Sequence, residues 1–115
     1  MFAEALNAGE RIGMISTFQP SVPSMEREFE MMADVAGSAA RLTTVNVDAA
    51  RTALGAGDVA THNRLVAEAV PQLGVCDAIL LAHFSTAQVL DAVRAVTKVP
   101  VLAAPDSAVR ALQAA

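Results

Sequence analysis

A chain of 115 residues, 54% of them hydrophobic, is long enough for one domain, residues 1–115, that buries roughly two-thirds of its extended surface. The formal charge of −4, the pI of about 4.9 and the lack of Trp and Tyr argue against nucleic-acid binding, which needs basic patches and stacking aromatic rings. No apolar run approaches the ~20 residues that span a bilayer, so we expect no membrane partner.

The first elements are short. Residues 2–9 can form one helical turn, and the apolar run of residues 11–17 predicts the first strand. Residues 18–24 contain Pro20 and Pro23 and are therefore predicted to form a loop.

A longer helix is predicted after this loop. Ser21 or Ser24 is placed to cap it, and Glu26 and Glu28 would lie in its first turn, where negative charge is favourable. Gly37 can end the helix. Apolar side chains recur at helical spacing and are expected to face the core: Met25, Phe29, Met32 and Val35 or Ala36.

The middle of the chain predicts a strand and two more helices. Residues 41–47 are rich in β-branched side chains and indicate the second strand, and residues 49–54 indicate a brief helix. Asp58 is expected to cap a longer helix, which Pro71 should kink or end. The side chains expected to point inward are Leu65, Val66, Ala69 and Val70.

The last third continues the alternation of strands and helices. Residues 76–83 predict strand three, residues 85–96 a helix, residues 99–103 strand four and residues 105–112 a final helix. Strand three is apolar on both faces, which is typical of a strand covered on both sides of a parallel sheet.

This alternation predicts an α/β fold with three layers, in which helices cover both faces of a four-stranded parallel sheet. The expected strand order is 2-1-3-4, a shortened flavodoxin-like pattern whose switch point lies between strands one and three. The carboxyl ends there carry Thr17 and His83, with residues 105–107 one strand further along. Ligands of open α/β sheets bind at such an edge.

Three segments carry a family resemblance. Residues 11–17, followed by Ser21 and Ser24, are similar to a strand and substrate-binding Thr/Ser loop, residues 77–83 to a catalytic strand, and residues 99–108 to the strand and helix that follow. In this order and spacing, the chain resembles the second half of the aspartate/glutamate/hydantoin racemase superfamily. The resemblance covers most of the chain.

The resemblance implies proton transfer without a cofactor, at the carbon next to a carboxylate or carbonyl of a small substrate. In such enzymes two alike α/β domains each offer a cysteine to one face of the substrate. Here His83 stands at the position of the cysteine, and Phe84 and Ser85 follow it where glutamate racemases have Thr-His. The family's first domain has no counterpart in residues 1–115, so we expect either a fragment of a longer protein or a half-size form. The resemblance then implies activity only when a second domain or subunit completes the site.

His83 is the candidate acid or base, because an unperturbed imidazole pKa near 6.5 suits proton transfer at neutral pH. The alternative is a histidine that only bonds a neighbouring carbonyl. The candidate substrate-binding residues are Thr17, Ser21, Ser24, Phe84, Ser85 and Thr86. Ser85 can also act structurally, since Ser85 and Gln88 form a capping box.

Two other side chains receive structural interpretations. Cys76 is the only thiol, but seven residues of strand put it roughly 20 Å from His83, so we expect it to be structural. His62 should pair with Asp58 or meet solvent. His62, His83 and Cys76 have no metal-ligand spacing.

Cellular context and partners complete the sequence-based expectations. Glu4 and Glu10 interrupt any secretory signal, and one cysteine cannot form an internal disulfide, so we expect a cytoplasmic protein. The high apolar content suggests a homo-oligomer or a missing partner domain. The expected ligand is a small carboxylate or an amino-acid-like molecule. The alternative function is a non-catalytic module that binds a small anion or mediates association.

Overall fold

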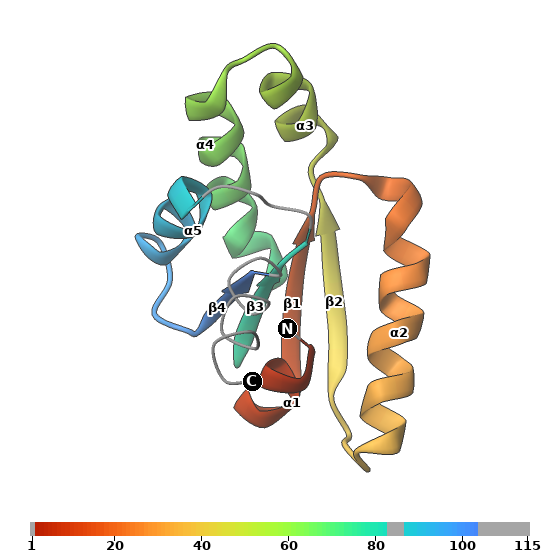
Figure 1. Ribbon diagram of the computed structural model, residues 1–115. Coiled ribbons are helices and arrows are strands. Elements are labelled where there is room, and N and C mark those ends of the chain that lie inside the picture. The colour runs from red at the N-terminus through yellow and green to blue at the C-terminus, as the bar shows by residue number, and fades with distance from the viewer. Residues whose placement is uncertain (1, 83–86, 104–115) are drawn as a thin grey trace, which may run out of the picture.

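A four-stranded parallel sheet in the order β2-β1-β3-β4 forms the centre of the described structure, as predicted (Figure 1). The structure, a computed structural model, describes residues 2–82 and 87–103. The strands are β1 (Arg11–Ser16), β2 (Arg41–Asn46), β3 (Ala78–Leu81) and β4 (Val101–Ala103). The chain therefore has the expected α/β architecture.

Helices cover both faces of this sheet, which gives the three predicted layers (Figure 1). On one face lie α1 (Phe2–Ala8) and α2 (Val22–Val35), the latter preceded by the 3-10 turn η1 (Gln19–Ser21). On the other face lie α3 (Asp48–Gly55), α4 (Val59–Ala69), the 3-10 turn η2 (Val70–Leu73) and α5 (Ala87–Arg94).

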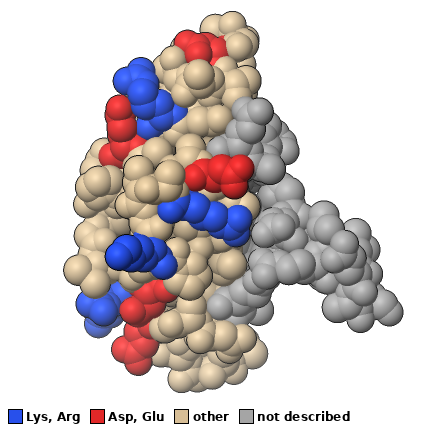
Figure 2. All heavy atoms as spheres, turned by 90° about the vertical axis from the view of Figure 1, so that its left-hand side faces the viewer, with Lys and Arg blue, Asp and Glu red and all other residues tan. Residues whose placement is uncertain are grey.

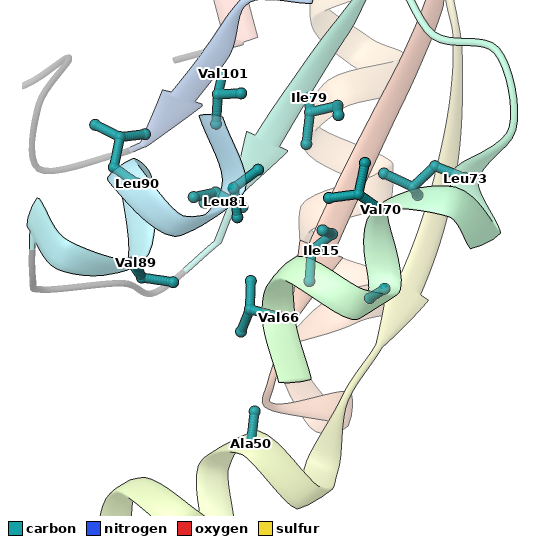
Figure 3. Close-up of a cluster of buried hydrophobic side chains, with 12 residues drawn as sticks. Ile15, Ala50, Val66, Val70, Leu73, Ile79, Leu81, Val89, Leu90 and Val101 are labelled. Carbon is teal, nitrogen blue, oxygen red and sulfur yellow. The ribbon is translucent and has the colours of Figure 1, made fainter. Parts of the chain in front are cut away.

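Two apolar cores result from the alternation of side chains along the central strands. Ile12 and Met14 of β1 face α1 and α2, while Ile15 faces the opposite layer. In Figure 3, Val66 of α4 lies between Ile15 and Ala50 of α3. Because β1 and β3 are flanked by strands and covered on both faces, both are buried over nearly their whole length.

The start of α2 differs from the prediction. The helix begins at Val22, because Pro23 fits the first turn, where a backbone donor has no helical acceptor to lose. Ser21 is the N-cap by position, but its side chain makes no capping bond and donates to the Phe18 carbonyl at 2.8 Å. Glu26 and Glu28 therefore lie beyond the first turn, and their predicted dipole role is wrong.

The end of α2 is fixed by Gly37, as expected. Its φ of +66° is a left-handed conformation that favours glycine, and the N–H groups of Gly37 and Ser38 donate to the carbonyls of Asp34 and Ala33. The helix buries Phe29 and Ala33, but Val35 is 91% exposed, so the prediction that Val35 faces the core is wrong. The buried residues of α2 are Val22, Phe29 and Ala33, and at 3.6 residues per turn Val35 lies on another side of the helix.

The middle of the chain follows the sequence prediction closely. The Asp58 carboxylate caps α4 by accepting from the Thr61 backbone N–H at 3.1 Å, and the hydrogen bond from the Thr61 hydroxyl lowers the pKa of Asp58. Pro71 lies in η2, where the α-helix has ended, as expected. Strand β3 is shorter than predicted, and Cys76 precedes it.

The amino-terminal edge of the sheet is held by Asp77. Its carboxylate accepts from the backbone N–H groups of Glu10 and Arg11 at 3.1 and 3.0 Å, and the Arg11 guanidinium lies 3.6 Å away. The hydrogen bond from the Arg11 N–H is the main cause of the lowered pKa of Asp77. Asp77 thereby joins the start of β3 to the start of β1. Within the described residues, no helix has the length and apolar character needed to cross a membrane.

Candidate functional site

The carboxyl ends of β1, β2 and β3 meet at one edge of the sheet, as the strand order requires. Ser16 lies opposite Asn46 in the β1–β2 register, and the N–H of Ala82, just after β3, donates to the Ile15 carbonyl at 3.0 Å. The order β2-β1-β3 makes this edge the switch point at which open α/β sheets bind ligands. We therefore call the segments that follow these three strands the carboxyl edge.

Thr17 brings a hydroxyl group to the carboxyl edge. The residue follows β1 directly and is only 7% exposed. Among the residues that the structure describes, none hydrogen-bonds to its hydroxyl. A hydroxyl without a protein partner at this edge is a candidate ligand contact, because ligands of open α/β sheets bind there. This position agrees with the role predicted for Thr17 from the sequence.

Ser16 fixes the turn that places Thr17. Its hydroxyl accepts from the Phe18 N–H at 3.2 Å and lies 3.4 Å from the Phe18 carbonyl, a local side-chain turn typical of serine. Ser21 supports the same turn by donating its hydroxyl to the Phe18 carbonyl. The Ser21 hydroxyl predicted to bind substrate thus shapes the loop that follows Thr17.

Arg51 of α3 brings a positive charge to the loop that follows β1. Its guanidinium carbon lies 4.1 Å from the centroid of the Phe18 ring, a stacked cation–π contact. Within the described part of the chain, the ion pairs are Arg11–Asp77 and Arg64–Glu68, so Arg51 has no carboxylate partner there. A guanidinium has enough N–H donors to bind a carboxylate through two parallel hydrogen bonds while its carbon lies over a ring.

Asn46 adds an unsatisfied acceptor to the carboxyl edge. Its amide nitrogen donates to the Asp48 carboxylate at 2.7 Å, while its buried amide oxygen has no hydrogen-bond partner within residues 2–82 and 87–103. An unsatisfied buried acceptor costs stability, which a donor brought by a ligand or by a conformational change would restore. Among the described residues of this edge, the amide oxygen of Asn46 is therefore the buried polar atom that lacks a hydrogen-bond partner.

His62 is buried near the start of α4, at 3% exposure. Its Nδ1 lies 2.9 Å from the Asn63 side-chain oxygen. The predicted pairing of His62 with Asp58 is wrong, because the Asp58 carboxylate bonds Thr61 instead. Val66, one helical turn further along, packs in the same core as Ile15, so His62 lies on the side of α4 that faces the sheet.

The remaining predicted site residues are placed differently. Ser24 is exposed on α2 and lines a groove between α1 and α2, together with residues of those two helices only. His83, Phe84, Ser85 and Thr86 lie outside the described residues, as does the helix predicted over residues 105–112. Of the predicted set, Thr17 and Ser21 are thus found in the segment following β1, at the carboxyl edge.

Sequence reasoning missed Arg51 and Asn46. A signal for Asn46 was available, because Asn46 closes the second predicted strand and so must lie at the same edge as Thr17. Arg51 carries no such signal, since its contact with Phe18 depends on how α3 packs beside the β1 loop. Both residues supply groups that recognise carboxylates or their polar neighbours.

Cys76 lies at the opposite, amino-terminal end of the sheet, as the structural interpretation requires. The thiol is half-buried and lies 3.7 Å from the Leu73 carbonyl. Burial is the main cause of the raised pKa of Cys76, and the nearby Asp77 carboxylate raises it further. A thiol with a raised pKa is a poor nucleophile at neutral pH.

Charge and metal-ligand geometry give no further site in the described residues. Lys and Arg side chains alternate with Asp and Glu on the face shown in Figure 2, so this face has no continuous basic surface. Within residues 2–82 and 87–103, no group of three His, Cys, Asp or Glu side chains is arranged to hold a metal ion.

The chain matches no protein-family model, no curated protein and no solved structure.

Proposed function

We propose that the chain binds a small carboxylate at the carboxyl edge and supports racemase-like, cofactor-independent proton transfer at the carbon next to that carboxylate. The chemistry requires a second domain or subunit, because two opposed groups must reach the two faces of one carbon. The observation that carries the proposal is that Arg51, which has no ion-pair partner among the described residues, contacts the ring of Phe18 next to Thr17, whose hydroxyl has no hydrogen-bond partner among those residues.

Arg51 and Thr17 have complementary roles in this proposal. The guanidinium supplies charge and two parallel donors, and Phe18 restricts its orientation before the ligand arrives, which lowers the entropy lost on binding. The Thr17 hydroxyl supplies a further donor from a residue that is largely buried. Amino acids, hydantoins and malonate-like diacids are the substrate classes that fit these donors and the family resemblance.

His83 is the proposed acid or base. It follows Ala82, whose backbone N–H is bonded to β1 beside the ligand-facing segment. An imidazole of ordinary pKa can accept the α-proton of a bound carboxylate and return it at neutral pH. The opposed group that protonates the other face would come from the second domain or subunit.

Binding is tested by titrating malonate, L-aspartate, L-glutamate and hydantoin into the protein, followed by calorimetry and thermal melting. Arg51→Gln should weaken carboxylate binding about tenfold or more, since a hydrogen bond to a charged group contributes roughly 1.5–3 kcal/mol. Arg64→Gln is the matched control, because Arg64 is exposed on α4 and pairs with Glu68. Equal losses in both variants would show that binding follows net charge and not this site.

Catalysis is tested by α-proton exchange in D2O, with the full-length protein and its His83→Ala variant. Exchange that disappears in the variant supports the assigned role. Exchange that persists unchanged contradicts it.

The alternative is a non-catalytic anion-binding module of the same fold. It is favoured by the fact that Arg51, Phe18 and Thr17 can bind a carboxylate without any second acid or base. Ligand binding that depends on Arg51, with no exchange in D2O under any condition, would identify this alternative.

A further inference from the structure

A second feature of the molecule is an open groove of about 720 Å³ between α1 and α2. In Figure 1, α2 forms one outer flank of the molecule and α1 lies near its carboxyl-terminal half. The groove involves none of the residues assigned to carboxylate binding. It is lined by Leu6, Asn7, Ser24, Arg27, Glu28, Met31, Met32, Val35 and Ala36.

The α2 side of this groove has the spacing of a helix-pairing seam. Ser24, Glu28, Met31 and Val35 follow one another at intervals of four, three and four residues, which places them on one line along the helix. Met31 is 63% exposed and Val35 is 91% exposed, so the apolar half of the seam faces solvent. Exposed apolar side chains at this spacing are the pattern by which one helix packs on another.

The charges beside the seam are complementary to a copy of themselves. Arg27 and Asp34 are both exposed and seven residues apart, so they lie on the same side of the seam, about 10.5 Å apart along the axis. If a second α2 packs antiparallel about a two-fold axis near the middle of the helix, Arg27 of each copy faces Asp34 of the other. The same axis brings the two Met31 side chains close together at its centre and places Val35 of each copy between the levels of Ser24 and Glu28 of the other.

We propose that the groove between α1 and α2 is the interface of a homodimer, in which the two α2 helices pack antiparallel. The pairing covers Met31 and Val35 and forms the two Arg27–Asp34 pairs, one at each end of the contact. An isologous arrangement of this kind needs only one self-complementary patch. Glu28 in the seam limits the apolar area, so the dimer is expected to dissociate at micromolar concentrations.

This inference is independent of the proposed function. The groove residues belong to α1 and α2, whereas Thr17, Phe18 and Arg51 belong to other segments. The dimer therefore forms whether or not the protein binds carboxylates, and it does not require a ligand.

Sedimentation velocity of the full chain between about 1 and 500 µM tests the proposal, because dimerisation follows mass action. The wild-type protein should pass from monomer to dimer over this range. Arg27→Glu and Asp34→Lys should each weaken the dimer about tenfold or more, since each places like charges opposite one another. Asp91→Lys is the matched control, because Asp91 is exposed on α5, which covers the other face of the sheet.

Recombining the charges distinguishes this interface from any other. A mixture of Arg27→Glu and Asp34→Lys chains should form a heterodimer, and the double variant Arg27→Glu/Asp34→Lys should recover the homodimer, because opposite charges then face each other again. Circular dichroism of each variant verifies that α2 is folded. A monomeric mass for the wild type at every concentration overturns the proposal, and so does a dimer that neither single variant weakens.

Discussion

Gly13→Ala tests how closely the layers of this fold are packed. Gly13 lies in β1, and a Cβ added there would stand 2.8 Å from Leu73 Cδ1 and 2.9 Å from Cys76 Sγ. Both neighbours precede β3 and pack on β1 from the α4 layer. The glycine is thus explained by lack of space, and a methyl group must displace at least one of these side chains.

The expected change in the free energy of unfolding for Gly13→Ala is the sum of two opposing effects. Alanine in a strand gains about 0.5–1 kcal/mol over glycine through the lower entropy of the unfolded chain. Overpacking a core typically costs about 1–3 kcal/mol. Because the contacts at Gly13 involve two side chains in a close-packed layer, we expect the overpacking to exceed the gain. The free energy of unfolding should therefore fall by roughly 0.5–2 kcal/mol. The melting temperature should fall by roughly 3–8 °C.

Urea unfolding followed by circular dichroism measures this change, with the m-value verifying that unfolding stays two-state. The matched control is Gly55→Ala, because a Cβ at Gly55 meets open space and should leave stability unchanged or slightly raised. Adding Cys76→Ala should reduce the cost of Gly13→Ala, since the vacated sulfur position gives the Leu73 side chain room to move. If Gly13→Ala is as stable as Gly55→Ala, the steric reasoning is wrong.

Three further predictions concern the core and the amino-terminal edge. Val66→Ala should cost about 2–3 kcal/mol in urea unfolding, since Val66 is fully buried and its lost methyl groups leave a cavity; a loss below about 1 kcal/mol contradicts this packing. The pKa of Asp77 is lowered by folding, so its contribution is present above the unfolded value near 3.9 and is lost as pH falls towards the folded value. Asp77→Asn should therefore lower the melting temperature at pH 7 but progressively less below about pH 4, and a constant difference would exclude this linkage. Because burial raises the pKa of the Cys76 thiol, a disulfide reagent at pH 7.5 should modify native Cys76 more slowly than the urea-unfolded chain, and equal rates would contradict its shielding.

The residues of the carboxyl edge show which parts of the candidate site could be predicted from the sequence and which could not. Thr17 could be placed there because it ends an apolar run, and the carboxyl ends of parallel strands meet at one edge. The contact of Arg51 with Phe18 could not be predicted, because it joins segments distant in sequence through the packing of α3. The burial of His62 escaped prediction for the same reason: its helix position allows either a solvent-facing or a sheet-facing side chain.

The sequence pattern also failed to predict where α2 begins and which of its side chains are exposed. The two prolines of residues 18–24 indicated a loop, yet Pro23 lies inside the first turn of α2. The earlier start moved Glu26 and Glu28 out of the first turn. Val35 is exposed on the groove because it lies on another side of the helix than the buried residues Phe29 and Ala33. A proline at the start of a helix and a proline in a loop have the same local preferences, so only packing of the helix against the sheet distinguishes them.

By itself the sequence determined the alternation of strands and helices, because apolar runs and helical periodicity are local properties of the chain. The topology rules of α/β folds then predicted the parallel sheet and its order β2-β1-β3-β4 from that alternation. Only the tertiary structure decided which groups meet: Arg51 with Phe18, Cys76 with Gly13, and α1 with α2 around an open groove. These contacts depend on how layers fit together in three dimensions, where the volume of each side chain is set against its neighbours from distant segments.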